Sequence, residues 1–247
     1  MVVGSRLKST NDPFQILLGS SGKNTSFNMA LISFVLLFLL IILIWIADKD
    51  RAQSALSYRF GVFWVCLAVI SSNISIGLGD FSIPISILTI CEMCIVIFKN
   101  GHKDFYVTKL KFSRSVILGI LVGLLFSILV ITFKHISGFI LFTFADDKLL
   151  ANLLTLLLIS INEELAFRSL ILGHLVSRVK VQPDLANLIQ AGLFTLAHLP
   201  KYYADNPSFL LIVFLIAIAL GYITLRTKNI TGAIVAHYLI NFLPLIT

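Results

Sequence analysis

Long runs of apolar residues recur along most of the chain and limit what it can fold into. Several of these runs approach the roughly 20 residues that a helix needs to cross the hydrocarbon core of a bilayer. The runs are continuous rather than alternating, so they favour membrane helices over the strands of a barrel. Of the 247 residues, 58% are hydrophobic and 13% are charged, which is too little charge to solvate a water-soluble domain. We therefore expect an all-α, polytopic membrane helical bundle.

The apolar runs predict about eight transmembrane helices. They are expected near residues 29–47, 60–79, 81–98, 115–133, 149–177, 185–199, 208–225 and 230–246. Residues 136–145 are apolar but too few to cross a bilayer, so we expect them to be re-entrant or interfacial. Residues 1–28 are polar and lack the pattern of a cleaved signal peptide, so the first span is expected to remain. The predicted organisation is a polar N-terminal segment, 1–28, followed by a single helical membrane domain, 29–247, in a multi-pass protein of the cell membrane.

Basic residues in the loops predict the orientation of these spans. The loops that contain residues 49–59, 99–114, 178–180 and 226–228 hold twelve Lys and Arg residues, against six in the opposite set. The positive-inside rule therefore places the first set in the cytoplasm. The net charge of +7 is scattered over these loops, which argues against a nucleic-acid partner and leaves the lipid bilayer as the surroundings of the protein.

Ionisable and amide side chains interrupt the apolar pattern in three late spans. Residues 161–168 read INEELAFR, residues 194–198 read FTLAH, and residues 237–241 read HYLIN. A charged residue inside a span costs roughly 2.5–3.5 kcal/mol on insertion scales, so each one needs a partner or a function. The polar residues singled out in this way are Glu163, Glu164, Arg168, His198, His237 and Asn241.

Helical spacing predicts how some of these side chains face. Residues four apart lie on one side of a helix, whereas neighbours point about 100° apart. Glu164 and Arg168 can therefore form an ion pair along their own helix. Glu163 must point elsewhere, toward another helix, where His198 and His237 are candidate partners. His237 shares a face with Asn241, four residues later.

Two kinds of hydrolytic site fit these side chains. In the first, a carboxylate beside a histidine holds and deprotonates a water molecule, while the other histidine and the asparagine donate hydrogen bonds to the oxyanion formed at an amide. In the second, Glu163, His198 and His237, together with Asn241, bind a zinc ion that activates the water. Asparagine is a poor zinc ligand, which favours the metal-free site. No cofactor is therefore assigned, and zinc is kept as the alternative.

Other functions would also place polar groups inside a membrane. A single Glu–Arg pair can be a structural strut, and a single histidine often only holds helices together. A proton-coupled transporter buries carboxylates and histidines too, and Glu92 in an early span could support that interpretation. Transporters of this kind are built from repeats, whereas the unusual polar residues here lie almost entirely in the second half of the chain.

In this order, the three motifs resemble those of the CPBP family of CAAX prenyl endopeptidases and bacteriocin-processing or self-immunity membrane proteins. Residues 163–172 read EELAFRSLIL, and residues 221–227 read GYITLRT ahead of the last motif. The likeness covers a protease-like core at about residues 149–246. Ser169 stands where family members usually have glycine, a change that close helix packing tolerates.

The resemblance implies an intramembrane endopeptidase that cuts membrane-associated proteins or peptides near the cytoplasmic side of the bilayer. It implies that Glu163 activates the water and His198 holds it or shares its proton. His237 and Asn241 would stabilise the oxyanion, and Glu164 and Arg168 would form a supporting pair. The alternative within the same fold is a non-catalytic immunity or scaffold protein.

Overall fold

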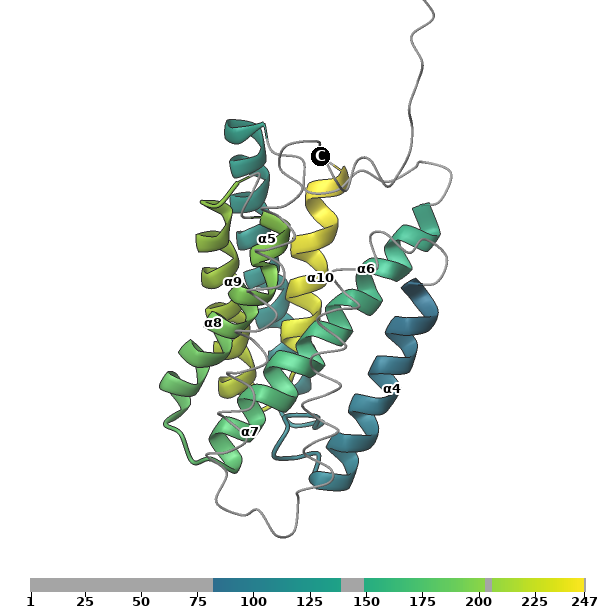
Figure 1. Ribbon diagram of the computed structural model, residues 1–247, viewed down its shortest axis with the longest axis vertical. Coiled ribbons are helices and arrows are strands. Elements are labelled where there is room, and N and C mark those ends of the chain that lie inside the picture. The colour runs from purple at the N-terminus through teal and green to yellow at the C-terminus, as the bar shows by residue number, and fades with distance from the viewer. Residues whose placement is uncertain (1–81, 139–148, 203–205, 247) are drawn as a thin grey trace, which may run out of the picture.

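Every regular element in the described part of the chain is helical. A computed structural model describes residues 82–138, 149–202 and 206–246 (Figure 1). Its elements are α4 (Ser82–Asn100), α5 (Phe112–Ser137), α6 (Leu149–Glu164), the π-helix η3 (Leu165–Ile171), α7 (Leu172–Ser177), α8 (Pro183–Tyr202), α9 (Phe209–Thr227) and α10 (Thr231–Ile246). No strand occurs in these ranges, which agrees with the predicted all-α class.

The six spans predicted after residue 80 all correspond to helices, with ends that differ by a few residues. By length and composition, α5 and α9 are the two described helices able to cross a membrane. The spans predicted near 29–47 and 60–79 lie outside the described residues, so the number eight stays a prediction. Most of the predicted re-entrant segment also lies outside them, and its first two residues, Ile136 and Ser137, belong to α5.

Small residues allow α5 and α10 to pack closely. The buried face of α5 consists of Ser115, Gly119, Gly123, Ser127 and Val130. A Cβ atom added to Gly119 would meet the backbone of Gly232 on α10, and one added to Gly123 would lie 3.0 Å from the Cα of Ala236. Small residues at this spacing are typical of close contacts between membrane helices. The contact fixes α10, which carries the last of the three predicted motifs, against α5.

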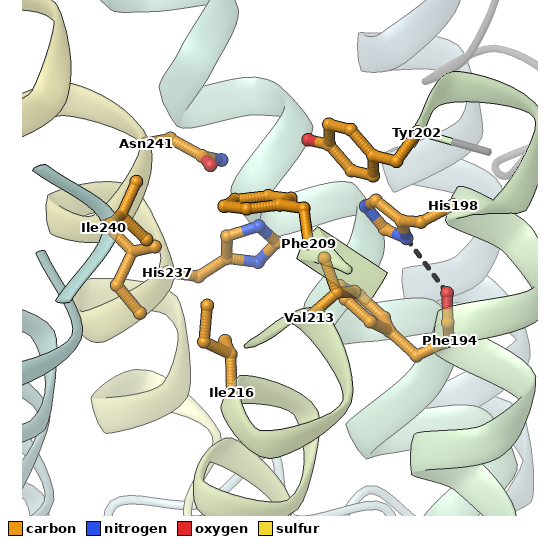
Figure 2. Close-up of a pocket in the computed structure, with 10 residues that line it drawn as sticks. Phe194, His198, Tyr202, Phe209, Val213, Ile216, His237, Ile240 and Asn241 are labelled. Carbon is orange, nitrogen blue, oxygen red and sulfur yellow. Dashed lines mark hydrogen bonds between the residues drawn. The ribbon is translucent and has the colours of Figure 1, made fainter. Parts of the chain in front are cut away.

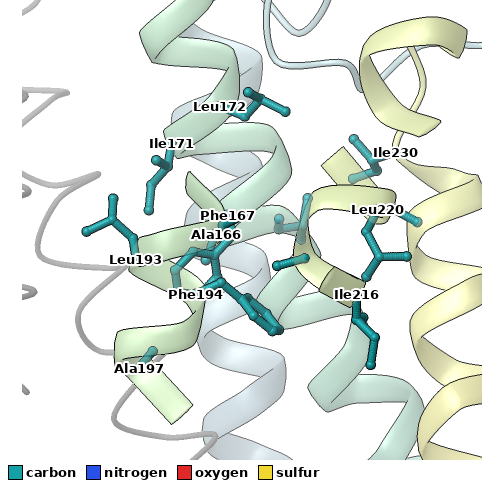
Figure 3. Packing of buried hydrophobic residues seen from close by; sticks show 14 of the residues in the cluster. Ala166, Phe167, Ile171, Leu172, Leu193, Phe194, Ala197, Ile216, Leu220 and Ile230 are labelled. Carbon is teal, nitrogen blue, oxygen red and sulfur yellow. The ribbon is translucent and has the colours of Figure 1, made fainter. Parts of the chain in front are cut away.

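The bundle is apolar on its outer surface as well as inside. The core includes Phe167 from η3, Phe194 from α8 and Leu220 from α9, which pack together in Figure 3. On the outer face of α5, Leu121 is 59% exposed and Leu125 is 64% exposed. A contiguous apolar surface of this kind marks a membrane or a partner, and the length of α5 fits a bilayer.

Hydrogen bonds join the loop before α5 to the turn between α9 and α10. The Asn229 side chain donates to the carbonyl of Leu110 at 3.2 Å, and the Thr108 hydroxyl donates to the carbonyl of Lys228 at 2.8 Å. The Lys111 ammonium donates to the carbonyl of Arg226 at 3.3 Å. These contacts join residues 108–111 to residues 226–229 at one end of the bundle, the lower end in Figure 1.

The opposite end of the bundle is where α5 and α10 finish. There the Lys134 ammonium donates to the carbonyl of Pro244 at 2.9 Å. The chain direction places the start of α6, the end of α8 and the start of α9 at this end too (Figure 1). The described helices therefore alternate in direction, as the predicted loop grouping requires.

The predicted fifth span, 149–177, is one continuous helical stretch that changes its hydrogen-bonding pattern in the middle. The seven residues of η3 are π-helical, and all of them are buried. Single π-helical turns within α-helices are rare and occur frequently at functional sites. This turn begins directly after Glu163 and Glu164, so it lies next to the most polar part of the core.

Candidate active site

Glu163 lies between two histidines that come from different helices. Its Oε2 atom is 3.7 Å from Nε2 of His198 on α8 and 3.7 Å from Nε2 of His237 on α10. This oxygen is buried and has no hydrogen-bond partner among the described residues. The separations are too long for direct hydrogen bonds. Three polar atoms therefore face one another with no direct hydrogen bond joining them.

The contacts at Nδ1 determine which nitrogen of each imidazole carries the proton when the ring is neutral. Nδ1 of His198 is 2.8 Å from the carbonyl oxygen of Phe194, and Nδ1 of His237 is 2.7 Å from Oε1 of Glu164. A carbonyl or an ionised carboxylate can only accept, so each Nδ1 carries the proton. In the neutral rings, Nε2 is then a lone-pair acceptor. In that form, both Nε2 atoms and the Glu163 carboxylate are acceptors.

Glu164 connects the histidine of α10 to an arginine on its own helical stretch. Its Oε1 accepts from Nη1 of Arg168 at 3.0 Å as well as from His237, and the Glu164 and Arg168 side chains are 0% exposed. The predicted pair of Glu164 with Arg168 is therefore present. The hydrogen bond between Glu164 and His237 was not predicted, because helical spacing gives no information about partners on other helices.

Arg168 holds three elements together. Its Nη2 donates to the carbonyl of Ala217 on α9 at 3.3 Å, and its guanidinium lies 4.3 Å above the ring centre of Phe194 on α8. Gln190 of α8 donates to the same carbonyl at 3.0 Å. A buried cation needs both charge compensation and hydrogen-bond acceptors. Glu164 at the end of α6 supplies the charge compensation, and the carbonyl of Ala217 on α9 supplies an acceptor.

A small pocket opens beside the two histidines (Figure 2). It is lined by Val130, Phe194, His198, Tyr202, Phe209, Val213, Ile216, His237, Ile240 and Asn241. Its cavity volume of about 30 Å³ is enough for one or two water molecules. Glu163 does not line the pocket, but its carboxylate lies 3.7 Å from both histidines that do. The pocket can therefore hold a water beside the two histidine rings and the Asn241 amide.

The donor set also has the chemistry of a zinc site. One carboxylate and two imidazoles are the protein ligands of several catalytic zinc ions, and a hydrogen bond from Nδ1 to a carboxylate or carbonyl is the usual support for such histidines. However, the described residues contain no group of three or more His, Cys, Asp or Glu side chains arranged to hold a metal ion. Zinc binding would require the three side chains to move closer together.

The structure gathers all the residues that the sequence singled out in the late spans. His198, His237 and Asn241 line the pocket, and Glu163 lies 3.7 Å from both histidines. Glu164 contacts His237 and pairs with Arg168. By contrast, Glu92 is half-buried on α4 and belongs to no contact of this site.

Several contributors to the site were missed by sequence reasoning. Tyr202 lines the pocket, and its only sequence signal is its position four residues after His198. Ser169 also forms a hydrogen bond that the sequence analysis did not predict. Its hydroxyl donates to the carbonyl of Phe105 at 2.5 Å and joins η3 to the loop before α5. Asn162 accepts from the Thr89 hydroxyl at 3.0 Å and joins α6 to α4.

Comparison with known families supports the resemblance seen in the motifs. Residues 145–243 match the family model described as type II CAAX prenyl endopeptidase Rce1-like. Searches of curated proteins and of solved structures gave no match to this chain. The matched residues run from the segment before α6 to within α10 and include all of the predicted site. Residues 145–243, less than half of the chain, are thus similar to the Rce1-like type II CAAX prenyl endopeptidases, a family of membrane-embedded proteases.

Proposed function

We propose that this membrane protein is an intramembrane endopeptidase in which Glu163 activates the hydrolytic water. The observation that supports it best is the arrangement of the Glu163 carboxylate and two Nε2 lone pairs beside a pocket large enough for water. A water molecule can donate two hydrogen bonds, which matches a set of acceptors with no donor of its own. Burial strengthens these interactions because the local dielectric is low.

The water would be held by His198 and Glu163. As its oxygen attacks the carbonyl carbon of the scissile amide, one of its protons passes to the Glu163 carboxylate. The carbonyl oxygen becomes an oxyanion, and the Asn241 amide at the pocket wall donates a hydrogen bond to it. The C–N bond then breaks, and the proton taken from the water is delivered to the leaving amine. The products are a carboxylic acid, which ionises by releasing its remaining proton, and a free amine.

We infer that His237 carries that proton from Glu163 to the leaving amine. Its Nδ1 proton is held by Glu164, so its Nε2 lone pair can accept a proton, and the adjacent carboxylate stabilises the imidazolium that results. This differs from the role expected from the resemblance, in which His237 donates to the oxyanion. A neutral His237 with its proton on Nδ1 has no proton on Nε2 to donate.

The substrates would be membrane-associated proteins or peptides. A protease family embedded in membranes implies a peptide or protein substrate, and the apolar wall formed by Val213, Ile216 and Ile240 suits an apolar side chain or lipid group near the cleaved bond. Prenylated and unprenylated peptides of the same sequence are therefore the natural pair of test substrates. We further propose that the chain is a multi-pass protein of the cell membrane.

The test is Glu163→Gln in the full-length protein in proteoliposomes. The change keeps size and hydrogen bonding but cannot take a proton, so we expect turnover of a quenched fluorogenic peptide to fall by about 10²–10⁴-fold. The melting temperature should stay the same or rise, because a buried charge with a desolvation cost is removed.

A matched analysis in cells identifies substrates. Peptide termini in the membrane fraction are compared between cells with the wild-type protein, cells with the Glu163→Gln variant and cells without the gene. Termini that depend on Glu163 support the protease. A phenotype rescued equally by the inactive variant would favour the scaffold or immunity function instead, and near-normal peptide cleavage by the variant would contradict the proposed mechanism.

A further inference from the structure

Four exposed cations lie where the loop before α5 meets the end of α9. Lys109 and Lys111 come from the loop, and Arg226 and Lys228 come from the last turn of α9 and the residue after it. The Lys111 ammonium donates to the carbonyl of Arg226 at 3.3 Å, and the Thr108 hydroxyl donates to the carbonyl of Lys228 at 2.8 Å. Two distant segments of the chain are thus held side by side. We call Lys109, Lys111, Arg226 and Lys228 the basic patch.

No carboxylate compensates the basic patch within the described residues. Residues 105–117 and 221–236 contain no Asp or Glu. Asp104, which comes just before the first of these segments, lies 3.9 Å from Arg178, outside the patch. None of the four cations forms an ion pair in the part of the chain that the structure describes. Like charges held close together repel one another, so the patch favours an anion supplied from outside the protein.

Two lysines of the patch occupy backbone positions that glycine would fill with less strain. Lys111 precedes α5 with a φ angle of 48°, and Lys228 follows α9 with a φ angle of 56°. Both angles lie in the left-handed region, which glycine adopts at low cost. The Lys228 ammonium is also 5.3 Å from the ring centre of Tyr106, which helps to hold it in place. The backbone therefore gives no reason for a lysine at either position, whereas a function of the side chains would.

Exposed apolar and aromatic side chains lie next to the patch. Leu110 is 61% exposed and Phe112 is 52% exposed, one on each side of Lys111 in the chain. On α9, Tyr222 is 49% exposed, and its ring centre lies 5.0 Å from the Arg226 guanidinium. Phe112 begins α5, which is long and apolar enough to cross a membrane. Tyrosine and long cationic side chains at the ends of such helices lie at the level of the lipid headgroups.

We propose that the basic patch binds the phosphate of an anionic phospholipid whose acyl chains lie against the exposed apolar residues of α5. Ammonium and guanidinium groups donate charge-assisted hydrogen bonds to phosphate oxygens, and basic pockets at the ends of membrane helices bind anionic headgroups. A bound lipid would stabilise the contact between the loop before α5 and the end of α9. The inference does not depend on the proposed peptidase activity, so either can fail without the other.

The test compares the full-length protein in nanodiscs of phosphatidylcholine with the same protein in discs of equimolar phosphatidylcholine and phosphatidylglycerol. We expect the anionic lipid to raise the melting temperature of the wild type by about 2–5 °C. The variant Lys111→Gln with Lys228→Gln should lose most of this increase. Each variant is compared with itself in the two lipids, so a change in its intrinsic stability does not affect the comparison.

The matched control is Lys103→Gln with Lys180→Gln. It also removes two exposed positive charges from loops at this end of the bundle, and Lys180 likewise has a positive φ angle, of 63°. The control should keep the full increase in melting temperature. A second patch variant, Lys109→Gln with Arg226→Gln, leaves both left-handed positions unchanged and should lose the increase as the first one does.

Native mass spectrometry then identifies the ligand. Wild-type protein released from the mixed discs should retain phosphatidylglycerol in preference to phosphatidylcholine, and both patch variants should lose this preference. Equal increases in melting temperature for the patch and control variants would show attraction to net charge alone and overturn the site. Inorganic phosphate that stabilises the wild type equally in phosphatidylcholine discs would replace the lipid by a soluble anion. A wild type with no increase, or with no preference between the two lipids, would also overturn the proposal.

Discussion

At the residue scale, one carboxylate of the site serves two partners. Glu164 accepts from Arg168 and from His237, so its charge is compensated by a guanidinium while it orients an imidazole. The three groups are buried, and the loss of Glu164 would leave both Arg168 and His237 without their carboxylate. Removing one member of a buried pair therefore costs much more than the pair contributes in total.

We expect Arg168→Ala to lower the free energy of unfolding by roughly 3–5 kcal/mol, because it leaves a buried, uncompensated carboxylate. The measurement is equilibrium unfolding in mixed micelles, or the melting temperature where unfolding is irreversible. The double variant Glu164→Gln with Arg168→Gln should recover part of the loss, since both charges are then absent. A double variant that is no more stable than Arg168→Ala would argue against the pairing as the source of the stability.

Metal content is a separate prediction at this scale. If Glu163 alone activates the water, active purified protein contains less than stoichiometric zinc, and strong chelators leave turnover unchanged. If the His198, His237 and Glu163 side chains instead close on an ion, elemental analysis finds about one zinc per chain, as an open catalytic zinc site requires. Activity lost on chelation and restored by zinc would decide for the metal-dependent mechanism.

At the scale of the elements, the site depends on how closely α5 approaches α10. His237 and Asn241 are carried by α10, whose position is set by glycines with no room for a side chain. A Cβ on Gly119 would lie 2.8 Å from the Cα of Gly232, so one helix would have to move. By contrast, nothing lies within 4 Å of a Cβ added to Gly192 on α8.

These two glycines give a matched pair of variants. Gly119→Ala should destabilise the protein by about 1–3 kcal/mol through overpacking and should also lower kcat, because α10 shifts relative to Glu163. Gly192→Ala should be neutral or stabilising by up to about 1 kcal/mol, since alanine favours a helix more than glycine does. Unfolding and turnover are measured on both. Equal behaviour of the two variants would show that the close contact does not set the site geometry.

At the scale of the whole molecule, the pocket and the basic loops lie at different ends. Tyr202 ends α8 and Phe209 begins α9, at the end where Lys134 meets Pro244. The loops at the other end carry Lys103, Lys109, Lys111, Arg114, Arg178, Lys180, Arg226 and Lys228. The positive-inside rule predicts that this end is cytoplasmic. That prediction would place the pocket nearer the opposite side of the membrane, whereas the resemblance implies cleavage near the cytoplasmic side.

Single-cysteine labelling tests this orientation. In a chain whose Cys66, Cys91 and Cys94 are replaced by serine, Ser208→Cys marks the pocket end and Lys109→Cys marks the basic end; both positions are exposed. We expect a membrane-impermeant maleimide to label position 208 in intact cells and position 109 only after permeabilisation. The reverse pattern would return the pocket to the cytoplasmic side.

The sequence by itself determined the class of fold, the positions of the helices after residue 80, and the pairing of Glu164 with Arg168. These features depend on hydrophobicity and on the spacing of nearby residues, both of which can be read from one amino-acid sequence. It also selected the polar residues of the site, because each is costly in lipid unless it has a partner or a function.

Tertiary structure decided which contacts between different helices form, including that both candidate histidines lie near Glu163. The link from Glu164 to His237, the placing of Glu163 between two histidines and the inclusion of Tyr202 all depend on the separation and rotation of different helices. Those quantities are set by the glycine contact of α5 with α10 and by the π-helical turn of η3. Helical periodicity fixes the face on which a side chain lies, but the partner across that face is chosen by packing.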